Sequence, residues 1–64
     1  MKQVLRAEVL ITRNPAELGS LISGFTEYER KKYENEKISF NFQYSTEIQM
    51  EKIIYTCLVI VGYE

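Results

Sequence analysis

Apolar and polar residues alternate from residue 2 to residue 12, and this period of two predicts a strand. One face of that strand would carry Leu5, Ala7, Val9 and Ile11. The other face would carry Arg6, Glu8 and Thr12 together with Val4 and Leu10. Because Val4 and Leu10 are apolar, the second face is not a plain solvent face, and their place on it needs an explanation.

The next segment changes to a helical period. Asn14 can cap a helix, Pro15 suits its first position, and Glu17 stands three residues after the cap. Apolar residues then recur at helical spacing: Leu18, Leu21, Ile22, Phe25 and Tyr28. Gly19 and Gly24 each cost about 1 kcal/mol relative to alanine, so they either allow close packing on the sheet or weaken the helix. Charged residues fill 27–37, which predicts an exposed last turn ending near residues 33–35.

The second half of the chain predicts two more strands. Residues 38–44 alternate cleanly, with Ile38, Phe40, Phe42 and Tyr44 on one face. Residues 53–63 are apolar on both faces and rich in β-branched side chains, which favours a strand over a buried helix. The segment 45–52 lacks Gly, Pro and Asn, so we expect a long hairpin with its tip near residues 46–49.

These elements predict one α+β domain over residues 1–64, in the order β-α-β-β. The helical crossover should make the first two strands parallel, and the hairpin makes the third antiparallel to the second. A strand that is apolar on both faces belongs in the centre, which gives a three-stranded sheet in the order 1-3-2. We expect one helix packed on one face, against Leu5, Ala7, Val9 and Ile11 of the first strand and Ile38, Phe40, Phe42 and Tyr44 of the second.

No predicted element covers the other face of this sheet. We expect that face to hold Val4, Leu10, Ile54, Leu58 and Ile60. An apolar patch of this kind exceeds what a monomer usually exposes, so a second copy or a different protein is expected to cover it. The alternative is a twisted sheet whose apolar residues are partly screened by long neighbouring side chains.

The composition argues against the common kinds of catalytic and metal site. The chain has no histidine and one cysteine, Cys57, so it offers no disulfide, no Cys/His zinc set and no histidine-activated nucleophile. Three scattered glycines do not form a phosphate-binding loop. We therefore expect a protein that is not an enzyme, with no catalytic residues, no cofactor and no metal. Cys57 is expected to be a buried, unreactive thiol.

The charge pattern argues against nucleic acid and membranes as partners. The formal net charge is −1, and the basic run at 30–32 is flanked by glutamates that cancel its field. The longest apolar run, within 53–61, is shorter than a membrane-spanning helix requires. With no visible signal peptide and a single cysteine, we expect a cytoplasmic protein.

Several exposed side chains are further candidates for recognition of a protein partner. Ile48 and Met50 would be apolar side chains at the hairpin tip. The tyrosines are amphipathic and common at recognition surfaces, and Tyr63 lies at the end of the last strand. The alternative is that two or three of the tyrosines edge the core.

The segments 38–45 and 54–60 resemble a small sporulation-associated protein family of endospore-forming bacteria and their phages. Members of that family have a similar length and the same element order, and their biochemical role is not clear. The helix start at Asn14 and Pro15 has no counterpart in this resemblance. The element order is also similar to that of dodecins, which stack a flavin on a tryptophan; this chain has no tryptophan, so the ligand does not carry over.

We therefore expect a small non-enzymatic interaction or regulatory module that acts through protein binding or self-assembly. The resemblance implies a role related to phages or sporulation. The alternative is an oligomeric small-ligand binding protein with a tyrosine-lined pocket between subunits. Bound absorbance or mass in the purified protein would distinguish the second hypothesis from the first.

Overall fold

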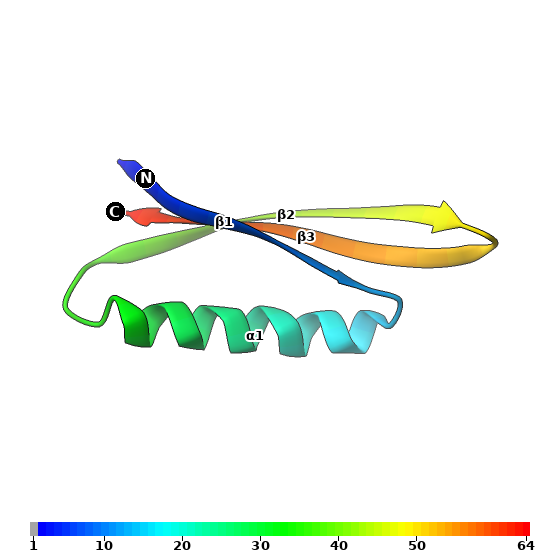
Figure 1. Cartoon of the computed structure of the whole chain (residues 1–64), viewed down its shortest axis with the longest axis horizontal. Coiled ribbons are helices and arrows are strands. Elements are labelled where there is room, and N and C mark those ends of the chain that lie inside the picture. The colour runs from blue at the N-terminus through cyan, green and yellow to red at the C-terminus, as the bar shows by residue number, and fades with distance from the viewer. Residues whose placement is uncertain (1) are drawn as a thin grey trace.

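A computed structural model describes residues 2–64 as a three-stranded antiparallel sheet with one helix on one face (Figure 1). The elements are β1 (Gln3–Thr12), α1 (Pro15–Lys32), β2 (Ile38–Gln49) and β3 (Lys52–Tyr63). The sheet order is β1-β3-β2. Because β3 is antiparallel to both neighbours, β1 and β2 run in the same direction. The predicted α+β class, element order and sheet order are confirmed.

The start of α1 follows directly from its sequence. The Asn14 side chain accepts a hydrogen bond from the backbone N–H of Ala16 at 3.0 Å, and Pro15 occupies the first turn. The hydroxyl of Thr12 donates to Glu17 at 3.0 Å, which ties the first turn to the end of β1. Tyr33 is the C-cap, in agreement with the predicted end of the helix.

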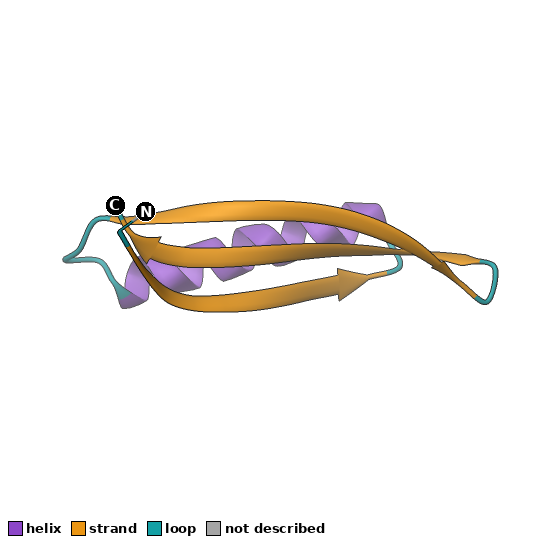
Figure 2. Ribbon diagram, turned by 90° about the horizontal axis from the view of Figure 1, so that it is seen from above, coloured by secondary structure: helices purple, strands orange, loops and turns teal. Residues whose placement is uncertain are grey.

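The core lies between α1 and the face of the sheet beneath it, which we call the helix face. Cys57, Val59 and Val61 of β3 are fully buried there. They are covered by partly buried apolar residues of the other three elements: Leu5, Leu10, Leu18, Ile22, Phe25, Ile38, Phe40 and Phe42. Figure 2 shows the helix behind the sheet and the opposite face, which we call the open face, towards the viewer.

The predicted orientation of β1 holds for Val4 and Leu5 and is wrong for residues 6–12. A register shift between Val4 and Arg6 places Leu5 at a β-bulge, and the extra residue exchanges the two faces of the strand. Leu5 and Leu10 therefore pack on the core, whereas Ala7, Val9 and Ile11 lie on the open face opposite Ile60, Leu58 and Thr56. A period-two pattern cannot reveal such an insertion, because it assumes uninterrupted pairing.

The predicted hairpin tip was also wrong. The strands pair as far as Gln49 with Lys52, which leaves a two-residue turn at Met50 and Glu51. Both residues have positive φ angles, 50° and 63°, as a tight hairpin turn requires. Turns of this kind favour Asn and Gly, so the residues at these positions gave no turn signal.

The two helix glycines do not serve close packing. A Cβ atom built at Gly19 or at Gly24 would meet nothing within 4 Å. Of the two interpretations of these glycines, close packing is therefore wrong, and the glycines weaken the helix locally.

Candidate functional site

The open face is an apolar surface that no other described element covers. It consists of Val4, Ala7, Val9, Ile11, Leu58 and Ile60. Val4, Val9 and Ile11 are 58%, 53% and 60% exposed, whereas Leu58 and Ile60 are half-buried. The register places Asn41, Gln43 and Ser45 of β2 beside Ile60, Leu58 and Thr56, so an uncharged polar rim borders the patch.

The open face is hollowed above β3. One hollow of about 320 Å³ is lined by Val4, Asn41, Gln43 and Ile60, with Lys2 and Gln3 at its end. A second hollow of about 360 Å³ is lined by Val9, Gln43, Tyr44, Ser45, Thr56 and Leu58. The exposed side chains of β1 thus form an aliphatic ridge beside these two hollows. Ile60 lines the first hollow and Leu58 lines the second.

A hairpin arm extends beyond the rest of the sheet. The last pair of β1 and β3 is Thr12 with Tyr55, so residues 47–54 are paired only with each other (Figure 1). Ile48 is 76% exposed, Met50 is 94% exposed and Ile53 is 49% exposed. Ile48 and Ile53 are directly opposite each other, so the arm presents an apolar pair that α1 does not cover.

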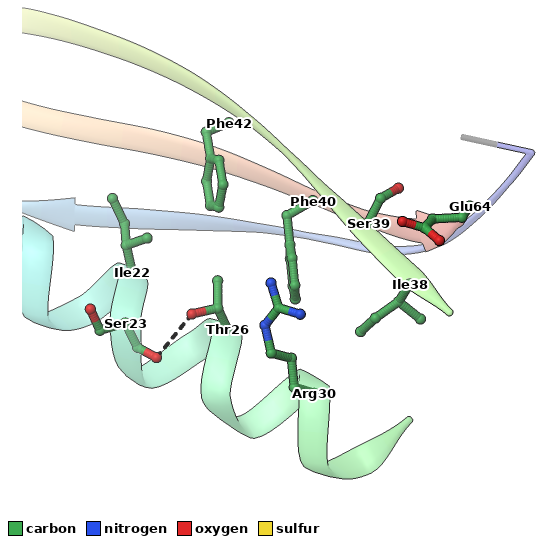
Figure 3. Close-up of a pocket in the computed structure, with 9 residues that line it drawn as sticks. All are labelled: Ile22, Ser23, Thr26, Arg30, Ile38, Ser39, Phe40, Phe42 and Glu64. Atoms are coloured by element: carbon green, nitrogen blue, oxygen red, sulfur yellow. Dashed lines mark hydrogen bonds between the residues drawn. The ribbon is translucent and has the colours of Figure 1, made fainter. Parts of the chain in front are cut away.

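A groove of about 480 Å³ separates the C-terminal half of α1 from the first residues of β2 (Figure 3). Its lining is mixed: Ile22, Ser23, Thr26, Arg30, Ile38, Ser39, Phe40, Phe42 and Glu64. Phe40, Phe42 and Tyr44 form a stacked ladder along β2, with ring centroids 6.1 and 6.4 Å apart. The Arg30 guanidinium lies 5.0 Å from the centre of the Phe40 ring, at the mouth of the groove.

A buried ion pair joins α1 to β1. Glu29 is fully buried, and its Oε1 accepts a hydrogen bond from Arg6 at 2.7 Å. Arg6 also donates to Glu8 at 2.6 Å and lies 5.3 Å from the centre of the Phe25 ring. The hydrogen bond to Glu8, with the charges of Glu29 and Glu8, raises the pKa of Arg6 despite some desolvation. Among residues 2–64, Glu29 Oε2 finds no hydrogen-bond partner.

This ion pair was not predicted. Glu29 belongs to the charged run after residue 27, and we assigned that run to solvent. Arg6 was assigned to the face away from the helix because the bulge at Leu5 was not foreseen. Two signals could have suggested it. Arg6 is a charged residue in the interior of a strand, and Glu29 lies one helical turn after Phe25, in line with the predicted apolar stripe.

The remaining predicted site residues divide between the surface and the interior. Val4, Leu58 and Ile60 lie on the open face, and Ile48 and Met50 are exposed at the arm, as expected. Leu10 is wrong as an open-face residue, because it packs on the core. Ile54 lies on that side of β3 but is only 8% exposed, so it is not available to a partner. Alternation assigns a face, but it does not measure how far neighbouring groups cover a side chain.

Two titratable side chains near the core have raised pKa values. Burial raises the pKa of the Cys57 thiol above 9.0, and a backbone hydrogen bond with Gln43 partly offsets this rise. Cys57 is fully buried, as predicted. Hydrogen bonding to Glu36 is the main cause of a raised pKa at Tyr63, which is half-buried at the end of β3.

Within residues 2–64, no three His, Cys, Asp or Glu side chains are grouped as metal ligands. None of the helices described there has the length and apolar character to cross a membrane.

Comparisons with known proteins give no relative. No protein-family model matches the chain, and neither a curated protein nor a solved structure matches it significantly.

Proposed function

We propose that this protein is a non-enzymatic interaction module that works by assembling with a second copy of itself through the open face. The observation that carries the proposal is the shape and charge of that face. In this assembly the ridge of Val9 and Ile11 on one copy would pack into the hollow above Leu58 on the other. Ridge and hollow lie on the same surface, so a two-fold axis satisfies both copies at once.

The charge of the open face supports a second copy as the occupant. A two-fold interface places the patch of one copy against the same patch of the other. A net charge on the patch would therefore repel the same charge on the second copy. The residues of the patch and of its β2 rim are all uncharged, and the face therefore meets itself without repulsion. An apolar centre with a polar rim is also the usual composition of an interface.

The monomer is extended for its size. Its accessible surface is 4805 Å², whereas a compact monomer of 7.6 kDa exposes about 4,300 Å². Its radius of gyration is 13.2 Å, against about 11 Å for a compact domain of this length. Burial of the open face would supply the apolar contacts that so small a core lacks.

Light scattering after gel filtration, over a range of concentrations, tests the proposal. We expect a mass above the 7.6 kDa of one chain, and a lower mass in Val9→Glu, which removes the open-face contact. The matched control is Ser20→Glu, which adds the same charge at an exposed helix position. Ile11→Glu repeats the test at a second site, and circular dichroism verifies that each variant is folded. A wild type that is monomeric throughout, or a Val9→Glu variant with unchanged mass, contradicts the proposal.

The resemblance to sporulation-associated proteins stays a prediction, and so do the cytoplasmic location and the absence of nucleic-acid partners. The small-ligand alternative also stays a prediction, because its pocket would lie between subunits. Within one copy, Tyr33 lines a groove at the end of α1 and Tyr44 lines a different hollow, so these two tyrosines do not share a site.

A further inference from the structure

The two edges of the sheet differ in how open they are to pairing. The β1 edge is interrupted by the bulge at Leu5, and Arg6 and Glu8 follow immediately. The β2 edge pairs with β3 without interruption from Ile38 to Gln49, and Glu47 is its single charged residue. Bulges and charges are the usual means by which proteins protect an edge strand, so β2 is the unprotected edge.

Two apolar features lie at opposite ends of this same edge. At one end the hairpin arm exposes Ile48 and Met50. At the other end the α1–β2 groove exposes an apolar wall that includes Ile38 and Phe40 (Figure 3). Reversing the direction of β2 exchanges its ends, so an antiparallel copy would place each arm beside the groove of the other.

We propose that β2 of one copy pairs with β2 of a second copy in antiparallel fashion, and that the arm of each copy occupies the α1–β2 groove of the other. The result is a continuous six-stranded sheet about a two-fold axis normal to it. This interface uses the edge and the helix face, so it is independent of the open-face contact.

The register follows from the side-chain alternation. Directly opposed residues of antiparallel strands share a face, so the helix-face residues of the two copies must oppose one another. A pairing centred on Gln43 or on Tyr44 satisfies this condition and overlaps nearly all of β2. Either centre places Ile48 opposite Ile38 or Phe40, at the wall of the groove.

The same registers avoid unfavourable charge contacts. Glu47 would oppose Ser39 when the centre is Gln43, and Asn41 when the centre is Tyr44. The aromatic ladder of one copy would lie beside that of the other, with Phe42 opposite Tyr44 or Thr46. Contacts of this type between opposed side chains are the main source of stability in paired strands.

Mass measurements on Val9→Glu test the edge separately from the open face. In this background we expect a particle of twice the 7.6 kDa chain mass, held by the β2 edges alone. Adding Ile48→Glu should reduce it to a monomer, because the charge would lie against the apolar wall that Ile38 and Phe40 form. Gln49→Glu is the matched control, since it adds the same charge on the opposite face of the same arm.

Cross-linking tests the register. In a Val9→Glu background that also carries Cys57→Val, which removes the native thiol opposite position 44, we expect Gln43→Cys or Tyr44→Cys to form a disulfide-linked dimer under mild oxidation, because one of them opposes itself across the axis. Ala7→Cys, in the same Val9→Glu background, should not cross-link. A monomeric Val9→Glu variant, an unchanged mass after Ile48→Glu, or the absence of cross-links at both 43 and 44 would overturn the edge interface. Failure of the open-face contact would give a different set of masses. The wild type would then have the same mass as Val9→Glu, and Ile48→Glu alone would be a monomer.

Discussion

The body of the sheet, where α1 covers β1 and β3, and the hairpin arm at 47–54 use apolar residues differently. In the body, Cys57, Val59 and Val61 are fully buried, and an ion pair links the helix to β1. In the arm, Ile48, Met50 and Ile53 are 76%, 94% and 49% exposed. The arm is held by its strand pairing, so these three side chains are not needed to fold the monomer and remain available for contacts with another chain.

The largest effect is expected when the ion pair of the body is broken. Arg6→Met leaves the buried Glu29 carboxylate without its partner, and an unpaired buried charge is strongly destabilising. A domain of this size has a total stability of only about 5 kcal/mol, so we expect the variant to be largely unfolded by circular dichroism. The double variant Arg6→Met/Glu29→Leu should recover much of the loss. A folded single variant with an unchanged melting temperature would show that the pair contributes nothing.

Truncation of matched apolar residues compares the body and the arm directly. Val59→Ala should lower the free energy of unfolding by about 2 kcal/mol, because it removes buried methyl groups and leaves a cavity. Ile48→Ala should change it by less than about 0.5 kcal/mol in a monomeric sample, because the side chain is exposed. Urea unfolding at a concentration below that of association measures both. Equal losses would mean that the arm is packed in the monomer.

Alanine at the two helix glycines should stabilise the body. The space around Gly24 is open and its backbone is helical, so Gly24→Ala should add about 1 kcal/mol to the free energy of unfolding. Gly19→Ala should act similarly and independently. A decrease after either substitution, measured by urea unfolding, would mean that the helix lies closer to a neighbouring surface than its glycines indicate.

The arm can be stabilised at its turn. Met50 and Glu51 both adopt a left-handed conformation that costs such residues about 1 kcal/mol or more. The double substitution Met50→Asn and Glu51→Gly supplies the residues that this turn favours. We therefore expect the free energy of unfolding, measured by thermal unfolding, to rise by about 1 kcal/mol. Slower amide exchange in the arm, with no change in the body, would assign the gain to the turn. An unchanged exchange rate would contradict this assignment.

The smallest effect is expected from alkaline pH. The folded state raises the pKa of Cys57 and of Tyr63 above 9.0 and 10.0, so folding disfavours their charged forms. Stability should therefore be constant below pH 9 and decrease as the pH rises through the folded pKa values. Urea midpoints between pH 7 and pH 10.5 measure this decrease, and Cys57→Val should reduce it. A stability that rises over this range would contradict the sign.

The sequence contained enough information for most of the fold. The alternation of Ile38 to Tyr44 defined β2, and the apolar character of both faces placed β3 in the centre. Asn14 and Pro15 defined the start of α1 because their preferences are local. Each of these features depends on neighbours along the chain, which one sequence displays in full.

The candidate site was only partly predictable, for reasons that involve distant residues. Val4, Leu58, Ile60, Ile48 and Met50 were expected at the surface and are found there, whereas Leu10 and Ile54 are not. Val9 and Ile11 were missed, because one extra residue at the bulge exchanged the faces of β1. The groove was missed as well, since the position of α1, mainly over β1 and β3 and only partly over β2, depends on contacts across the sheet.

The sequence by itself determined the number, order and type of the elements, because hydrophobic period and capping act over a few residues. Only the tertiary structure decided which side of β1 meets the helix. That choice depends on a single inserted residue and on an ion pair between Arg6 and Glu29, 23 positions apart in the chain. It also decided which apolar residues remain exposed, because burial depends on what the rest of the chain places above a side chain and not on the side chain itself.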